Sequence, residues 1–285
     1  MRYLNVGCGL RYFKDAEWTN VDIVSTGEDV IACDLKNGIP FPNNTFDFVY
    51  HSHVFEHIPK SQADFFISEC IRVLRPNGIL RVVIPDLEGI ITNYLRLLEK
   101  GIENPNSKEI AADYDWIMLE MYDQCVRNTE GGEMLNYLKQ EPLINQDFVF
   151  SRISTEGKNM RKSFLNSKSK KPYKFIPDSL WKRVISPKTY SRAIEQLLTF
   201  SKRKFIRKNK EVIETGKFRL CGETHQWMYD RYSLSRILFK HGLVNISTRK
   251  ADESYLQNWS KYNLDTEPDG STYKPDSLFM EGLKK

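Results

Sequence analysis

Five short apolar runs in the first 85 residues limit the possible folds of this chain more than any other feature. Turn residues, or a segment with helical spacing at 61–74, separate successive runs. The last run, ILRVVI, is almost continuously apolar, which is typical of a strand buried in a parallel sheet. This alternation predicts an α/β sheet with crossover connections. The five runs are Tyr3–Val6, Thr19–Ile23, Val30–Cys33, Phe46–Tyr50 and Ile79–Ile84.

The pattern changes after Pro85 and predicts a large, mainly helical insertion after the fifth strand. Residues 88–219 show helical spacing and few strand-like runs. Within them, the Ser- and Lys-rich segment 158–174 predicts an exposed loop or lid. Segment 186–208 predicts an amphipathic helix with a basic face.

The α/β pattern returns near the end of the sequence. Ser233–His241 has helical spacing and stops before Gly242, and strand-like runs follow at Leu243–Thr248 and Ser277–Leu283. We therefore expect a core of residues 1–87 and 220–285, interrupted by the insertion at 88–219.

Charge is distributed unevenly along the chain. The net charge is +5, but residues 158–217 contain 18 Lys or Arg and only 4 Asp or Glu. Such a segment suits an anionic acceptor or, through a basic helix at 191–210, a membrane surface. A solvated helical face is the alternative explanation.

Two absences in the sequence bear on location and metal binding. We find neither a long apolar span nor a signal peptide, so we expect a cytoplasmic protein. The five scattered cysteines lack CxxC spacing, which argues against a disulfide framework and a zinc site. We therefore predict no metal.

The first apolar run leads directly into Gly7-Cys8-Gly9, and Asp22 lies at the end of the second run. Glycine lets the backbone approach a ligand closely because it lacks Cβ and tolerates positive φ. An acid at the end of the next strand is placed to accept hydrogen bonds from ribose hydroxyls. The missing third glycine and the short gap to Asp22 argue against an NAD fingerprint. The pattern therefore predicts a nucleoside site, although a plain tight turn also explains two glycines.

Several further motifs follow in a fixed order. The series NVGCG, NVDI, CDL, FDFVYHSHVFEHI and RVLRPNG resembles the class I S-adenosylmethionine-dependent methyltransferases. The segments HQWMYDRYSLSRILFKHGL and LFMEGLKK resemble a subgroup of these enzymes associated with polysaccharide biosynthesis. The resemblance covers about residues 1–90 and 220–285. It implies a Rossmann-like fold, S-adenosylmethionine as cofactor and methyl transfer as the activity.

The resemblance also implies which residues contact the cofactor. The glycines would let the loop run close to the methionine part of the cofactor. The acid after the second strand would bind the ribose, although such an acid can also be a strand-end cap. The acid after the third strand would flank the adenine, although a surface-loop acid is an alternative there. The implied set is Asn5, Gly7, Cys8, Gly9, Asp22, Asp34, Leu35, Ser52 and His53.

Two features depart from the family pattern. The family usually has an acid where this chain has Asn5, which predicts weaker charge complementarity to the cofactor's amino group. The segment between Gly9 and the second strand is also short, which leaves little room for a full helix.

A hydroxyl acceptor needs a group that removes its proton. We expect this general base to be His225 or His53, because neutral imidazole titrates near working pH, or Asp86 after the fifth strand. Glu56 and His57 lie in the same region, but His57 is better explained as a structural residue.

The leading functional hypothesis is O-methylation of a small-molecule or glycan acceptor, with the insertion covering the substrate. The basic segment would then receive an anionic group. Methylation of nucleic acid or protein is an alternative, although the sequence shows no interleaved aromatic platform for bases, which argues against nucleic acid. A non-catalytic cofactor-binding subunit is a further alternative. The sequence makes no prediction about the oligomeric state.

Overall fold

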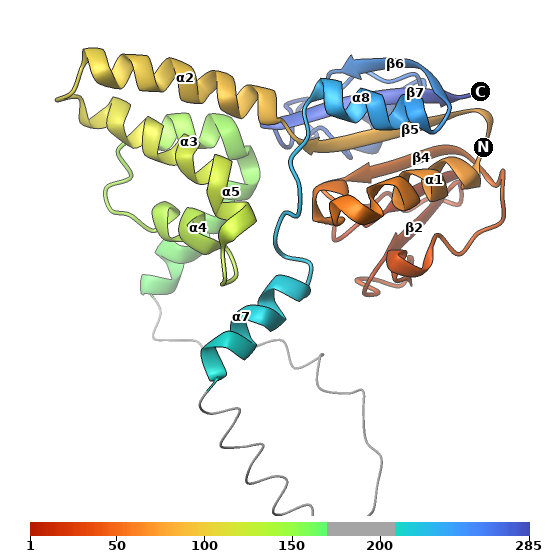
Figure 1. Cartoon of the computed structure of the whole chain (residues 1–285), viewed down its shortest axis with the longest axis horizontal. Helices are drawn as coiled ribbons and strands as arrows, with labels where there is room; N and C mark the ends of the chain where they lie inside the picture. Colours follow the sequence, from red (N-terminus) through yellow and green to blue (C-terminus); the bar gives the residue numbers. More distant parts are fainter. Residues whose placement is uncertain (170–208) are drawn as a thin grey trace, which may run out of the picture.

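The computed structural model describes residues 1–169 and 209–285, with the side chains of 167–169 left out. These residues form a seven-stranded sheet with helices beside it (Figure 1). The sheet order is β3-β2-β1-β4-β5-β7-β6. The strands are β1 (Tyr3–Val6), β2 (Trp18–Asp22), β3 (Val30–Ala32), β4 (Phe46–Ser52), β5 (Leu74–Pro85), β6 (Leu243–Arg249) and β7 (Ser277–Lys284).

Strands β1 to β5 are mutually parallel, and β7 is antiparallel to both β5 and β6. The five apolar runs therefore form the predicted strands, and the α/β expectation is confirmed. Because the strands are parallel, the residues that follow β1, β2 and β4 meet at one edge of the sheet. The antiparallel β7 begins at that same edge, since Ser277 pairs with Pro85.

Two helices cover one face of the sheet, α1 (Ala63–Val73) and α8 (Arg231–Lys240) (Figure 1). Asp230 caps α8 by accepting a hydrogen bond from the Ser233 N–H at 2.7 Å. The apolar sides of both helices bury the inward side chains of the strands. The main core includes Leu4, Val6, Phe46, Val49, Phe66, Ile67, Leu80, Val82, Leu234 and Leu238.

The face of the sheet opposite α1 and α8 is not covered by a helix between β1 and β2. Residues 7–17, all of them described, contain no helix, which confirms that this connection is too short for one. The segment between β6 and β7, with a short helix at Trp259–Tyr262, packs there instead. Its aromatic residues contact Tyr3, Trp18 and Phe48 on the sheet.

A buried ionic cluster fixes this covering segment to the sheet. Arg81 on β5 is fully buried and donates to Asp265 at 2.7 Å and to Glu281 at 2.8 Å. It also donates to the backbone carbonyls of Lys250 and Ala251. Two carboxylates thus balance the positive charge of Arg81 inside the fold, as a buried guanidinium requires.

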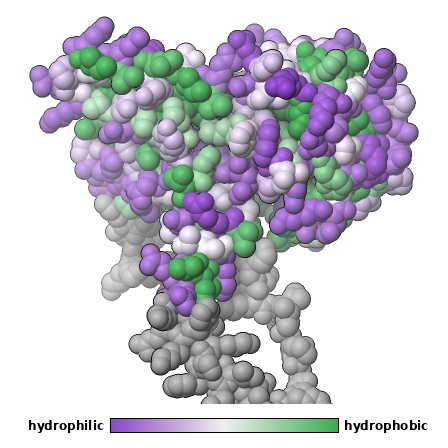
Figure 2. Space-filling model, viewed as in Figure 1, coloured by the Kyte–Doolittle hydropathy of each residue, from purple (hydrophilic) through white to green (hydrophobic). Residues whose placement is uncertain are grey.

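A group of helices follows β5 and stands beside the sheet (Figure 1). Ser107 caps α3 through its hydroxyl. Figure 2 shows apolar side chains on the surface over α2, where Ile91, Leu95 and Ile102 are exposed. These helices are α2 (Leu87–Glu103), α3 (Lys108–Val126), α4 (Gly132–Leu138) and α5 (Gln146–Ser169). A further helix, α7 (Lys210–Leu220), lies below them in Figure 1.

The expectation of a loop at 158–174 is wrong for its first part, because α5 continues to Ser169. Arg161 explains part of the difference. Its guanidinium is buried and donates to the carbonyls of Leu138 and Gln140 at 2.6 and 2.9 Å, at the end of α4. A basic residue that the composition predicts to be exposed thus donates hydrogen bonds to carbonyls at the C-terminus of a helix. Most of the expected basic helix, at 186–208 and at 191–210, lies outside the described residues.

Within residues 1–169 and 209–285, we find no helix with the length and apolarity needed to cross a bilayer. The cytoplasmic location stays a prediction.

Candidate functional site

The turn after β1 is held to the end of β2. Gly7 and Gly9 have φ of +67° and +53°, in the left-handed region that favours glycine. The N–H of Gly9 donates to Oδ2 of Asp22 at 2.8 Å, and the N–H of Gly7 donates to the Val21 carbonyl at 2.8 Å. The structure therefore brings together the two glycines and the acid that the sequence singled out.

The two glycines have different surroundings. A Cβ on Gly7 would clash with Cγ2 of Val54, whereas a Cβ on Gly9 would meet no atom within 4 Å. Val54 directly follows His53, so the glycine turn packs against the turn after β4. The space beside Gly9 is open.

The residues around this turn are buried and structurally engaged. Asn5 is 1% exposed, and its Nδ2 donates to the Arg11 carbonyl at 3.2 Å. An ionised carboxylate could not donate this hydrogen bond, which explains why an amide suits position 5. Cys8 is buried, and burial raises the pKa of its thiol to about 12.

Asp34 and Leu35 lie apart from the glycine turn. Asp34 is exposed and accepts a hydrogen bond from the Lys36 N–H at 3.0 Å, which caps a short helix at Leu35–Asn37. Leu35 packs against the main core. Their contact with an adenine stays a prediction.

Strand β4 ends at Ser52, which is half-buried, and the chain turns sharply at His53, whose φ is +53°. The His53 ring lies between two partners. Its Nδ1 is 3.1 Å from Oε1 of Glu56, and its Nε2 is 2.9 Å from Oγ of Ser277. A carboxylate beside one ring nitrogen orients the imidazole.

Glu56 is a buried acid that remains ionised. It is 1% exposed, and burial alone would raise its pKa. The contact with the His53 imidazole, 3.1 Å from Oε1, outweighs burial and is the main reason that the pKa of Glu56 is lowered to about 2.

The segment that follows α7 forms backbone hydrogen bonds with Glu56. The Glu56 carbonyl accepts from the N–H groups of Gln226 and Trp227 at 2.7 and 3.2 Å. These bonds bring His225 beside His57, with ring centroids 4.8 Å apart. Burial lowers the pKa of His225 to about 3, so its imidazole is neutral and weakly basic.

Asp86 lies at the edge of this region. It is half-buried at the N-terminus of α2, and its N–H donates to the Asp276 carbonyl at 2.9 Å. Asp276 lines the cavity described next, whereas Asp86 is not among the lining residues. Its role as a base stays a prediction.

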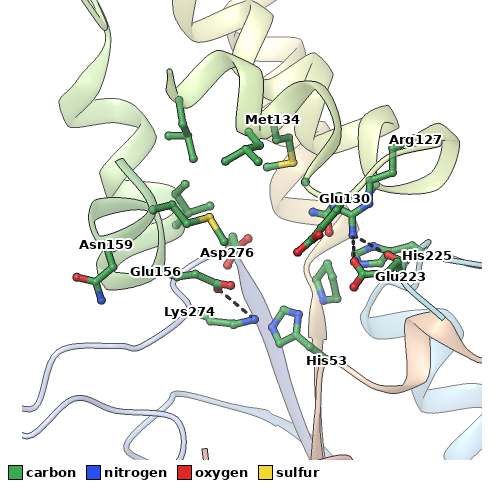
Figure 3. Close-up of a pocket in the computed structure, with 18 of the residues that line it drawn as sticks. His53, Arg127, Glu130, Met134, Glu156, Asn159, Glu223, His225, Lys274 and Asp276 are labelled. Atoms are coloured by element: carbon green, nitrogen blue, oxygen red, sulfur yellow. Dashed lines mark hydrogen bonds and ion pairs between the residues drawn. The ribbon is translucent and has the colours of Figure 1, made fainter. Parts of the chain in front are cut away.

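A cavity of about 980 Å³ opens between the sheet edge and the helices. Figure 3 shows His53 and Lys274 on the sheet side and Met134 on the helical side. His53, His57 and His225 line it. The residues implied for the cofactor, His53 apart, do not line this cavity.

Charged pairs occupy two sides of the cavity (Figure 3). Lys274 lies 3.4 Å from Glu156 on α5, and Arg127 lies 3.6 Å from Glu223. Lys274, Glu156 and Ser277 are site residues that the motifs of the sequence did not single out. The signal in the sequence is the strand-like run that begins at Ser277, and in the structure this strand begins at the edge where the parallel strands end.

Comparisons with known proteins agree with the motifs. Residues 4–82 match the family model described as a methyltransferase domain. No curated protein matches the chain. The family match places a methyltransferase domain in the N-terminal part of the chain, for which S-adenosylmethionine is the cofactor.

Similar solved structures include a methyltransferase from Aquifex aeolicus with 22% identity and a TM-score of 0.25, covering 30% of this chain and 57% of that one. A methyltransferase from Archaeoglobus fulgidus shows 12% identity and a TM-score of 0.37 over 99% of this chain and 86% of that one. A Burkholderia thailandensis 1,6-didemethyltoxoflavin N1-methyltransferase with bound S-adenosylhomocysteine shows 19% identity and a TM-score of 0.25, covering 30% of this chain and 46% of that one. The chain thus spans less than two thirds of the first of these structures.

Proposed function

We propose that this chain methylates a hydroxyl group of a small-molecule or glycan acceptor, with S-adenosylmethionine as donor and His53 as general base. The observation behind the proposal is the position of His53. Its ring lines the cavity, is oriented by a buried carboxylate, and directly precedes the residue that packs on the glycine turn.

The residues around the glycine turn fit the cofactor. The open space beside Gly9 admits a ligand close to the backbone, and a Cβ there would enter that space. Each oxygen of Asp22 already accepts a backbone N–H, and each keeps a lone pair for a ribose hydroxyl. In this proposal residues 1–87 and 220–285 bind the cofactor, with Asn5, Cys8 and Ser52 as supporting residues.

When bound, S-adenosylmethionine supplies a methyl group on a positively charged sulfur, and the acceptor oxygen displaces that sulfur. The protein must align the acceptor and receive its proton. Nε2 of His53 receives the proton in our proposal, and Oγ of Ser277 lies 2.9 Å from that nitrogen. Glu56 stabilises the imidazolium through Nδ1.

His53 suits this role better than His225. Burial lowers the pKa of His225 to about 3, so it takes up a proton poorly at neutral pH. His53 instead has a carboxylate on one nitrogen and the cavity beside it. We therefore propose His225 as a binding residue, and Asp86 only as a residue near the acceptor.

The charges around the cavity favour a neutral, hydroxyl-rich acceptor over an anionic one. Among the lining residues that the structure describes, two of the four carboxylates are paired with the one lysine and the one arginine. Glu130 and Asp276 add negative charge, which opposes a phosphate. The described lining includes residues of α3, α4 and α5, so the insertion at 88–219 supplies the wall opposite the sheet.

Two measurements test this proposal. The first is calorimetric titration with S-adenosylhomocysteine. Asp22→Asn should weaken binding by about 1–3 kcal/mol, because it removes a charged acceptor from the Gly9 N–H and from the ribose hydroxyls of the ligand. Asp29→Asn, on an exposed loop beside Lys14, is the matched control and should bind like wild type. Equal affinities for all three proteins would refute the cofactor site.

The second is transfer of a radiolabelled methyl group to a panel of neutral sugars, sugar phosphates, RNA and protein. His53→Gln should keep its affinity for S-adenosylhomocysteine and lose about 100- to 10,000-fold in kcat, the usual contribution of a general base. His241→Gln, which removes an imidazole outside the cavity, should keep full activity. Labelling of RNA or protein alone would refute the proposed acceptor class.

A further inference from the structure

We propose that Glu56, His57 and His225 bind a divalent transition-metal ion at the wall of the cavity. One ligand atom from each of these residues lies within 4.8 Å of those of the other two. Two imidazole nitrogens and one carboxylate oxygen are a donor set that zinc, iron, manganese and cobalt accept.

The carboxylate of Glu56 is the first observation that points to a cation. The side chain is buried, and His53 contacts Oε1 at 3.1 Å. Oε2 is shielded from solvent and accepts no hydrogen bond from any described residue. Burying an ionised oxygen without a partner is costly, so a positive ion at this point would stabilise it.

The orientation of His57 is the second observation. Its Nδ1 lies 3.3 Å from the Thr224 carbonyl, which places the proton on Nδ1 and leaves Nε2 as an acceptor. Metal-binding histidines commonly use one nitrogen for the ion and donate from the other to a backbone carbonyl or carboxylate.

His225 completes the set from a distant part of the sequence. Its position is fixed by its own N–H, which donates to the Gln124 carbonyl at 2.9 Å. In the part of the chain that the structure describes, its ring nitrogens have no hydrogen bond. The ring is free to present a lone pair to the ion.

The geometry needs only a small adjustment. Metal–ligand bonds of about 2.0–2.2 Å place the ligand atoms of a tetrahedral site roughly 3.3–3.6 Å apart. Side-chain rotations bring atoms that lie up to 4.8 Å apart to that separation. Three protein ligands leave at least one open position, as catalytic metal sites do.

The open position faces the acceptor region, because His57 and His225 both line the cavity. A metal ion there would bind an acceptor hydroxyl and lower its pKa, which assists the removal of its proton by His53. This role rests on the proposed function, whereas metal binding itself does not.

The experiment is a calorimetric titration of chelator-treated protein with Co²⁺ and Zn²⁺. It uses a Cys221→Ser background, because that exposed thiol also lines the cavity. We expect one site per chain, and at least about 100-fold weaker binding for His57→Ala and His225→Ala, which each remove one of three ligands. His241→Ala is the matched control and should bind like the background protein.

Circular dichroism checks that each variant is folded, and His57→Gln replaces His57→Ala if the alanine variant unfolds. Loss of the metal by the folded ligand variants, with retention by the control, supports the site. No binding by the background protein, or equal binding by all variants, overturns it.

Binding of S-adenosylhomocysteine is measured on the same samples. That result reports on the proposed function alone. The two proposals can therefore fail independently.

Discussion

The two glycines of the first turn predict different consequences for the same substitution. Gly7→Ala places a Cβ at positive φ and against Val54. Gly9→Ala places a Cβ at positive φ in open space. The comparison separates backbone strain, which both variants share, from steric overlap, which belongs to Gly7 alone.

The magnitudes follow from this geometry. A left-handed conformation costs an L-residue about 1–2 kcal/mol, and the loss of unfolded-state entropy on replacing glycine offsets about 0.4–1 kcal/mol of it. Overpacking against Val54 adds about 1–3 kcal/mol. The free energy of unfolding should therefore fall by about 1–3 kcal/mol more in Gly7→Ala than in Gly9→Ala, because the shared terms cancel.

Urea unfolding followed by circular dichroism measures this difference. Val54→Ala removes the methyl group that the new Cβ meets, so combining it with Gly7→Ala should cost at least about 1 kcal/mol less than the sum of the two single changes. Additive costs, or equal losses in the two glycine variants, would refute the reasoning. Gly9→Ala should instead lose affinity for S-adenosylhomocysteine while it remains folded.

Arg81→Met leaves two buried carboxylates without their cation, so urea titration should show a loss of about 3–5 kcal/mol in the free energy of unfolding, and a loss below about 1 kcal/mol would contradict the cluster. The hydrogen bond from Arg72 is the main reason that the pKa of Glu69 is lowered. Its stabilisation is present above the unfolded-state pKa of about 4.3 and is lost as pH falls through the lower folded-state value, so Glu69→Gln should lose less stability than wild type between about pH 5 and pH 3. In intact-mass maleimide labelling the exposed Cys221 should react before the buried Cys70, and early modification of Cys70 would show that the core packing is wrong.

The strands were predictable because their apolar runs are local. Each run needs only neighbouring residues to be recognised, and the glycines and Asp22 follow from their positions at strand ends. The segment that covers the second face was not predictable, because its contacts depend on pairs such as Tyr50 and Asp265, whose side chains meet at 2.6 Å across the fold. The hydrophobic periodicity of a sequence does not predict such a long-range pair.

The residues of the cavity were likewise predictable only where they are close in the sequence. His53 and Glu56 are close in the sequence, and their relation follows from a turn after β4. His225 reaches them through long-range backbone hydrogen bonds, its own to Gln124 and those of the next two residues to Glu56. The end of α5 was missed for a similar reason, since the carbonyls that bind Arg161 belong to another helix.

The place of β7 in the sheet affects how the chain is made. β7 pairs along the full length of Ile79–Pro85, yet about 190 residues separate the end of β5 from its start. A ribosome that adds 5–20 residues per second needs roughly 10–40 s to synthesise that interval. Throughout it, an apolar strand edge has no permanent neighbour, which invites pairing with other chains. Production of this protein should therefore depend on chaperones that shield nascent strands.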